Sequence, residues 1–170
     1  MDVATIASKY TTVSINRQPV ESDYLFSLFD KPTTFGKVAT FVHWESNHGL
    51  DNVTKIALKP SDIPLIEPIE RDGFPCYGWK FFTVSAVCNW CIREGYTDVY
   101  LVGVDHDENE KQFTHFDDTI SPNKTLHVSH HQGIKMFIYE CAMHTNIYQT
   151  NPAVRDKWEL PFVDIDTLLK

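Results

Sequence analysis

The sequence has no long apolar run, no excess of basic residues and few cysteines. None of its apolar runs approaches the roughly 18 residues that a membrane-spanning helix needs, so no transmembrane segment is expected. Lys and Arg total 15 against 23 Asp and Glu, and the net charge of -8 argues against nucleic acid as a partner. Four cysteines are too few for disulfides to stabilise a chain of 170 residues, which favours a reducing, cytoplasmic location.

Internal repeats, low-complexity tracts and linkers rich in Gly or Ser are also missing. A length of 170 residues and a hydrophobic content of 42% are typical of one globular core. We therefore predict a single domain over residues 1–170.

Short apolar or β-branched runs, each closed by turn residues, predict strands in the first third of the chain. These runs are Tyr10–Asn16, Tyr24–Phe29, Val38–Trp44 and the weaker Thr54–Leu58. Four prolines then fall between Pro60 and Pro75. Because proline removes a donor of the strand ladder, we interpret this segment as an irregular surface excursion.

Helices and strands alternate in the rest of the chain. Helical spacing of apolar residues predicts a helix over Thr83–Glu94, closed by Gly95, and a capping box of Ser129 with Gln132 predicts a second helix to about Met143 or His144. The other expected elements are the strands Asp98–Val104 and Asn146–Gln149 and a helical turn within Val163–Leu169. This alternation predicts an α/β fold with an open, mostly parallel sheet flanked by helices, that is, a Rossmann-like sheet.

Polar side chains follow several of the predicted strands. Ligands of open α/β sheets bind beyond the carboxyl ends of the strands. Asn16 and Arg17 follow the first strand, and Asp105 follows Asp98–Val104. They are candidate ligand-binding residues, although strands also end in polar residues without any ligand.

Asp105 and Asp107 form a D-x-D pair directly after an apolar strand. Two carboxylates in this position suit Mg²⁺ or Mn²⁺ bound to a nucleotide diphosphate, because hard cations prefer oxygen ligands. The alternative is an acidic surface loop.

His130 and His131 fall in the first turn of the second predicted helix. The helix dipole disfavours a positive charge there, so a histidine stays neutral near pH 7 and can act as a general base. The alternative is a pair of surface histidines. A zinc site from His106, His115 and the histidines within His127–His131 has no recognised spacing.

Cys88 and Cys91 form a C-x-x-C pair in the middle of the first predicted helix. A redox pair needs its first cysteine at a helix N-terminus, where the thiolate is stabilised. We therefore expect both thiols to pack in the core.

The run Thr83–Asp105 (TVSAVCNWCIREGYTDVYLVGVD) resembles the helix, Gly-Tyr, strand and G-x-D signature of sialyltransferase-like proteins. Ile134–Leu169 is similar to the C-terminal part of this family, and Asn16-Arg17 looks like its early x-N-R element. The family includes bacterial lipooligosaccharide sialyltransferases, motility-accessory-factor proteins and a hydroxymethylpterin diphosphokinase. The resemblance covers most of the chain.

The resemblance implies a nucleotide-binding sialyltransferase-like sheet that uses a CMP-sugar-like donor and a glycan acceptor without requiring a metal. It implies that Asn16 and Thr83 lie near the nucleotide, and that His130 or His131 is the base that deprotonates the acceptor hydroxyl. The expected role is in surface-glycan or lipopolysaccharide biosynthesis.

The chain departs from the family pattern in two places. Family members begin with a strand and a G-x-G-P-S-like loop, which belong before the first residues of this chain. The family's phosphate-holding tyrosines correspond approximately to Asp107 and Phe113. Two alternatives therefore stay open: a metal-dependent nucleotide-diphosphate transferase using Asp105 and Asp107, or an inactive or truncated module whose exposed sheet edge favours homo-oligomers.

Overall fold

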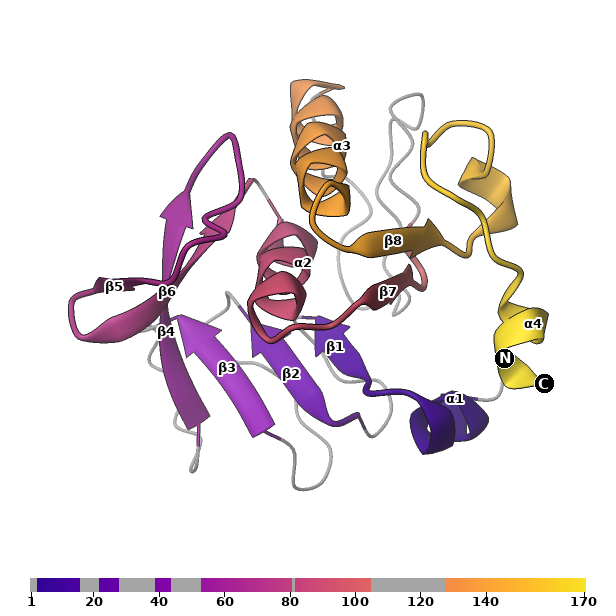
Figure 1. Ribbon diagram of the computed structural model, residues 1–170, viewed down its shortest axis with the longest axis horizontal. Helices are drawn as coiled ribbons and strands as arrows, with labels where there is room; N and C mark the ends of the chain where they lie inside the picture. The colour runs from indigo at the N-terminus through magenta and orange to yellow at the C-terminus, as the bar shows by residue number, and fades with distance from the viewer. Residues whose placement is uncertain (1–2, 16–21, 28–38, 44–52, 81, 105–127) are drawn as a thin grey trace, which may run out of the picture.

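The computed structural model describes residues 3–15, 22–27, 39–43, 53–80, 82–104 and 128–170. Helices and strands alternate in a mixed α/β arrangement (Figure 1). Its strands form a six-stranded sheet in the order β1-β2-β3-β4-β6-β5 and a two-stranded sheet of β7 and β8. The α/β class predicted from the sequence is confirmed at this level.

The six-stranded sheet is mostly parallel. Neighbours from β1 to β4 run parallel, β6 runs parallel to β4, and only the edge strand β5 is antiparallel. The bounds of these strands are β1 Val13–Ile15, β2 Tyr24–Ser27, β3 Ala39–His43, β4 Val53–Pro60, β5 Ile69–Arg71 and β6 Phe74–Trp79. The expected strands near the N-terminus are thus present, each within two or three residues of its predicted bounds.

Consecutive residues of the inner strands are buried. Leu25, Phe26 and Ser27 of β2 are almost inaccessible to solvent, as are Ile56 and Ala57 of β4. Since successive strand side chains point to opposite faces, both faces of the sheet are covered at these positions. This burial explains why the strands read as continuous apolar runs in the sequence.

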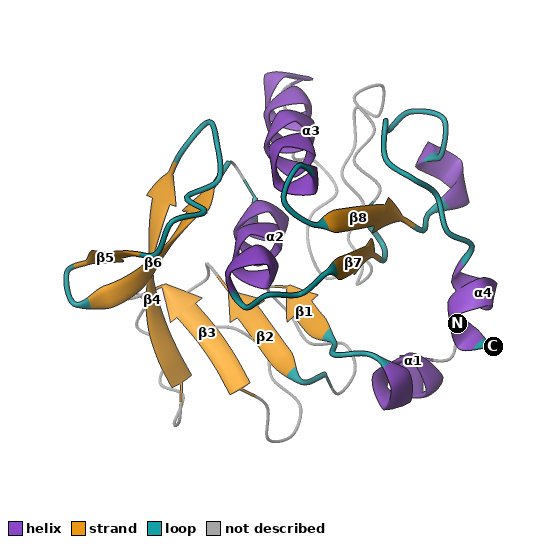
Figure 2. Cartoon of the chain, viewed as in Figure 1, coloured by secondary structure: helices purple, strands orange, loops and turns teal. Residues whose placement is uncertain are grey.

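Helix α2 (Thr83–Arg93) packs on one face of this sheet (Figure 2). Ala86, Val87 and Trp90 of α2 share a hydrophobic cluster with Phe26 and Ile56. The Trp90 ring lies 5.4 Å from that of Phe26 and the same distance from that of Phe41. Aromatic burial of this kind stabilises the helix on the sheet more strongly than helix propensity alone.

The second half of the chain contains a parallel strand, helix, strand unit. Strand β7 (Asp98–Leu101) pairs with β8 (Asn146–Gln149), and helix α3 (Val128–Ala142) lies between them in sequence. Gly95 has a φ of 83°, the left-handed conformation expected of the residue that closes α2. These elements agree with those predicted from the sequence.

The remaining described elements are short helices near the two ends of the described chain. Helices α1 (Val3–Lys9) and α4 (Ile165–Leu169) lie close to one another, and the Lys9 ammonium donates a hydrogen bond to the Leu169 carbonyl, at 2.9 Å. A 3-10 helix over Pro152–Val154 follows β8. Helix α4 matches the predicted terminal turn, whereas α1 was not anticipated.

Two expectations about strand organisation were wrong. The segment from Pro60 to Pro75 is not wholly irregular, because it contains β5 and the start of β6. Asp72 and Gly73 join these two strands in a tight turn, with φ of 54° and 82°. Asp-Gly is a strong hairpin signal because both central residues need positive φ. In addition, β7 pairs with β8 and, among the described strands, with no member of the six-stranded sheet.

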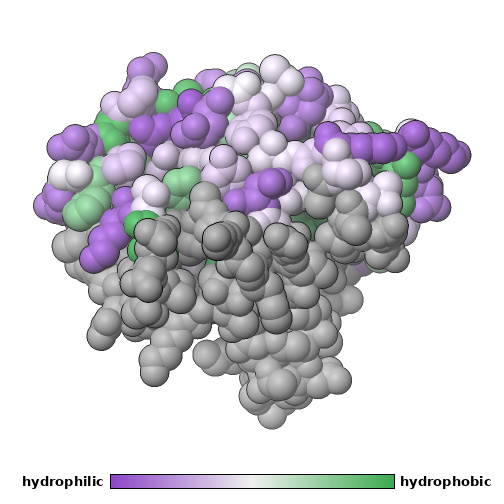
Figure 3. Space-filling model, turned by 90° about the horizontal axis from the view of Figure 1, so that it is seen from below, coloured by the Kyte–Doolittle hydropathy of each residue, from purple (hydrophilic) through white to green (hydrophobic). Residues whose placement is uncertain are grey.

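No helix within the described ranges combines the length and the apolar character needed to cross a bilayer. On the face drawn in Figure 3, hydrophobic residues of the described part are scattered among hydrophilic ones. Scattered apolar residues are normal for a protein surface and do not by themselves mark an interface.

Candidate functional site

The carboxyl ends of five parallel strands lie along one edge of the six-stranded sheet. Strand β4 is followed by Ser61 and Asp62, and β6 by Lys80. Asn16 and Arg17 follow β1 in sequence, but both lie outside the described residues. The structure describes the residues that follow β4 and β6 and the start of α2, whereas the residues that follow β1, β2 and β3 lie outside the described ranges.

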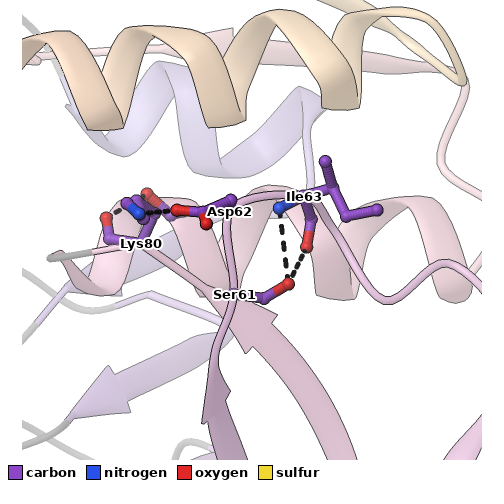
Figure 4. A network of polar contacts seen from close by, with 5 residues as sticks. Ser61, Asp62, Ile63 and Lys80 are labelled. Atoms are coloured by element: carbon purple, nitrogen blue, oxygen red, sulfur yellow. Dashed lines mark hydrogen bonds and ion pairs between the residues drawn. The ribbon is translucent and has the colours of Figure 1, made fainter.

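Lys80 forms an ion pair with Asp62 across the ends of β6 and β4 (Figure 4). The Lys80 side chain is 24% exposed, whereas that of Asp62 is 84% exposed. The Ser61 hydroxyl lies between the Ile63 N–H and C=O and closes the turn that presents Asp62. The Lys80 ammonium thus lies at the sheet edge beside an exposed carboxylate, and most of the Lys80 side chain is covered by protein.

The start of α2 lies three residues after Lys80. Thr83 is the first helical residue and is 3% exposed, so its predicted place at the opening of the helix is confirmed, although its role is not tested. Phe82 precedes it in an extended conformation and provides no side-chain cap. The Ser85 hydroxyl donates to the Lys80 carbonyl at 3.1 Å, which ties the first turn of the helix to the end of β6.

The loop that carries Asp62 is fixed against β6 and α2 by a close backbone approach. A Cβ atom on Gly78 would lie 2.9 Å from the Leu65 backbone nitrogen. The buried Asn89 amide of α2 is oriented to accept from the Gly78 N–H at 2.7 Å and to donate to the Leu65 carbonyl at 3.2 Å. Strand, loop and helix therefore form one rigid support beneath the Asp62 and Lys80 pair.

A second support lies at the carboxyl ends of β7 and β8. Gln149 is fully buried, and its amide donates to the Val104 carbonyl at 2.9 Å, while its side-chain oxygen accepts from the Thr150 and Asn151 N–H groups. The Gln149 amide thus makes three hydrogen bonds to described backbone groups, which indicates a structural role. The hydrogen bond fixes the backbone immediately before Asp105.

The predicted metal ligands Asp105 and Asp107 lie outside the described residues, as do His106 and His115. The described parts of the chain contain no group of three or more His, Cys, Asp or Glu side chains suited to a metal. The magnesium or manganese site and the zinc alternative therefore remain predictions.

His130 and His131 lie in the first turn of α3, as expected, but their side chains are outside the described part. The helix begins at Val128, one residue before the predicted capping residue Ser129. Ile134, one turn further along, is fully buried in a cluster shared with α2 and β7. The backbone of this first turn is therefore carried by a well-packed helix.

One hydrophobic cluster joins the elements that carry the predicted site residues. Ile15, Phe82 and Val104 all pack against the cluster that contains Ile134. These residues directly precede Asn16, Thr83 and Asp105 in sequence, and Ile134 follows His130 by one helical turn. The residues that adjoin the predicted site residues in sequence thus pack around one core. Of the predicted site side chains themselves, the structure describes that of Thr83 and leaves the others undescribed.

Lys80 was missed by the sequence analysis because β6 was missed. The run Phe74–Trp79 follows an Asp-Gly turn and is mostly apolar or aromatic, which is a hairpin signal. Recognition of that strand would have placed Lys80 at the carboxyl edge together with Asn16.

The expectation that Cys88 and Cys91 pack in the core is confirmed. Both side chains are buried, and neither takes part in a disulfide. Burial raises the pKa of the Cys91 thiol to about 12 and that of Cys88 well above its ordinary value. Thiols held in this protonated state are poor nucleophiles and poor metal ligands.

A shallow hollow lies at the opposite end of the β7 and β8 pair, among the last residues of α2 and α3. It is lined by residues 95–97 and 142–146 together with Ile92. No residue predicted from the sequence as part of the site contributes to it.

Comparison of the chain with protein-family models, with curated proteins and with solved structures finds no significant match.

Proposed function

We propose that the protein is a glycosyltransferase-like enzyme that transfers a sugar from a CMP-sugar-like donor to a glycan acceptor. It would act in the cytoplasm, in the biosynthesis of surface glycans or lipopolysaccharide. In this proposal the two sheets together correspond to the Rossmann-like, sialyltransferase-like nucleotide-binding sheet, with the donor at the carboxyl edge.

One observation supports this proposal above others. The residues next to Asn16, Thr83, Asp105 and His130 pack around a single hydrophobic cluster, although they come from four separate parts of the chain. Ligand sites of open α/β sheets form where such strand ends meet. A shared core holds the supporting backbone in place before the ligand binds, which lowers the cost of ordering the site.

The carboxyl edge suits an anionic donor. Lys80 supplies a positive charge there, and α2 begins three residues later with its N–H groups at the same edge. In the proposal the donor phosphate competes with Asp62 for the Lys80 ammonium. The rest of the donor contacts Asn16, Arg17, Thr83 and Asp105.

The general base is proposed to be His130 or His131. A histidine in the first turn of α3 is disfavoured as a cation by the helix dipole, so its ring nitrogen is free to accept a proton near pH 7. It would take the proton of the acceptor hydroxyl as that oxygen attacks the anomeric carbon. The nucleotide leaves with the bonding electron pair.

Calorimetric titration with CMP, and in parallel with UMP, GDP and ADP, tests the proposal. We expect binding of CMP in the micromolar to millimolar range, unchanged by EDTA. Absence of binding by all four nucleotides would reject the nucleotide-sugar function. Binding that disappears with EDTA and in Asp107→Asn would instead support the metal-dependent transferase.

A further inference from the structure

The tight turn between β5 and β6 holds the single Asp-Gly pair of the sequence, Asp72-Gly73, and the sequence has no Asn-Gly pair. Both residues have a positive φ, as the central residues of a two-residue hairpin need. The Asp72 side chain is 55% exposed, and a Cβ added to Gly73 would meet no described atom within 4 Å. The turn therefore projects into open space at the edge of the sheet.

An aspartate followed by glycine can form a succinimide, a five-membered ring between the glycine nitrogen and the side-chain carbon of the aspartate. Glycine favours this ring because it has no side chain to shield its nitrogen. In the described part of the chain the Gly73 N–H donates no hydrogen bond, since the flanking pair Arg71 and Phe74 closes the hairpin. The Gly73 nitrogen is therefore not held by a partner.

The closed turn opposes the reaction, because ring closure needs the Asp72 backbone to rotate out of its left-handed conformation. Opening costs little here, since β5 is the three-residue outer strand of its sheet and all of its residues are exposed (Figure 1). The ion pair of Arg71 with Asp72 spans 3.4 Å, and the two side chains are 51% and 55% exposed. A pair so exposed adds little to the stability of the turn.

We propose that Asp72 is a site of spontaneous isoaspartate formation. The Gly73 nitrogen bonds to the Asp72 Cγ, and the hydroxyl group of that carbon leaves as water together with the amide proton. Water then adds to the backbone carbonyl carbon of Asp72 and breaks its bond to the nitrogen, so that the chain continues through the Asp72 side chain. The turn gains one backbone carbon, and the register of β5 on β6 is lost.

This site does not depend on the proposed transferase function. It lies at the amino end of β6, whereas Lys80 follows the carboxyl end of the same strand. Conversion of Asp72 is therefore measured on the chain without any nucleotide, and its outcome neither supports nor rejects the nucleotide site.

The test incubates the whole folded chain at neutral pH, in parallel with the same chain unfolded in guanidinium chloride. Peptide mapping and methylation by a protein isoaspartyl methyltransferase measure the isoaspartate. We expect Asp72 in the folded chain to convert within about tenfold of its rate in the unfolded chain, because a weak edge hairpin opens readily. Asp62 and Asp98 are internal controls, since each precedes a β-branched residue that shields the nitrogen, and both should stay unmodified.

Asp72→Glu is the control variant. It keeps the charge but would require a six-membered ring, so the isoaspartate signal should vanish even if the substitution loosens the hairpin. A signal that persists in this variant places the modification elsewhere and overturns the proposal. The proposal is also overturned if the folded chain stays unmodified while the unfolded chain converts, or if Asp98 converts as fast as Asp72 in the folded chain.

Discussion

Lys80 and Asp62 form an ion pair that joins the ends of strands β6 and β4 at the carboxyl edge of the sheet. The pair is asymmetric, because Lys80 is largely covered whereas Asp62 is exposed. An exposed carboxylate is easily displaced, since an exposed ion pair contributes at most about 1 kcal/mol. In the proposed function, a ligand phosphate competes with Asp62 for the Lys80 ammonium.

Replacing Lys80 with Gln should weaken CMP binding about tenfold, because the phosphate loses a charge-assisted hydrogen bond. Asp62→Asn should leave CMP binding unchanged or strengthen it slightly, since the competing carboxylate is lost. Calorimetric titration of both variants measures the two effects. Equal affinities of the Lys80→Gln variant and the unaltered chain would show that the phosphate does not bind at this edge.

Gly78→Ala should destabilise the protein by about 1–3 kcal/mol, because the new Cβ would meet the Leu65 backbone at 2.9 Å and a backbone cannot move aside cheaply. The loop that presents Asp62 must then shift. We expect a lower urea midpoint and weaker CMP binding in this variant.

Gly95→Ala is the matched control. Gly95 has a φ of 83°, and a Cβ there meets nothing within 4 Å, so the cost is one of backbone conformation, about 1 kcal/mol. This variant should lose stability and keep its CMP affinity. The same loss of affinity in both variants would mean that the effect of Gly78→Ala is general destabilisation.

Asn89→Ala should lower the free energy of unfolding by about 3 kcal/mol. The substitution leaves the Gly78 N–H and the Leu65 carbonyl without their side-chain partner beneath α2. Asn146→Ala, on an exposed side chain, should change stability by no more than about 0.5 kcal/mol. Urea unfolding of the two variants measures the difference, and similar losses would contradict a bridging role for Asn89.

The parts of the fold that the sequence predicts are those whose pattern is local. Helix α2 has apolar residues at helical spacing and a closing Gly95, and β8 lies between a helix and Asn151-Pro152, so both match their predicted places. Strand β6 was missed because the prolines around it outweighed the Asp-Gly turn. Among the described strands, Pro75 pairs with the three-residue edge strand β5, and the pairing of β6 with β4 begins only at Cys76, so proline is tolerated there.

Pairing between distant segments could not be predicted in the same way. The sequence of β7 does not indicate whether this strand pairs with β8 or joins the six-stranded sheet. The pairing depends on where α2 and α3 pack. The site was predicted from residues that follow predicted strands. Lys80 was therefore not included, because the strand that precedes it, β6, was not predicted. The bridging role of Asn89 depends on the approach of Leu65 to Gly78, which has no sequence pattern.

The buried thiols between α2 and α3 should make the protein less stable in alkali. Burial raises the pKa of Cys91 from 9.0 to about 12 and raises those of Cys88 and Cys141 as well. Protonated thiols are therefore favoured by the folded state. Their stabilising contribution is complete below pH 9.0 and is lost as the pH rises toward 12, because the unfolded chain releases these protons first.

Urea unfolding at pH 8 and pH 10 measures this loss, and Cys91→Ala provides the comparison because tyrosines also titrate in this range. The variant should be less stable than the unaltered chain at pH 8, by about 1–2 kcal/mol for the removed sulfur. It should then lose less stability between the two pH values, since one of the perturbed thiols is gone. An equal loss in both chains would mean that Cys91 ionises as readily in the folded state as in the unfolded state, and would contradict its burial in the core.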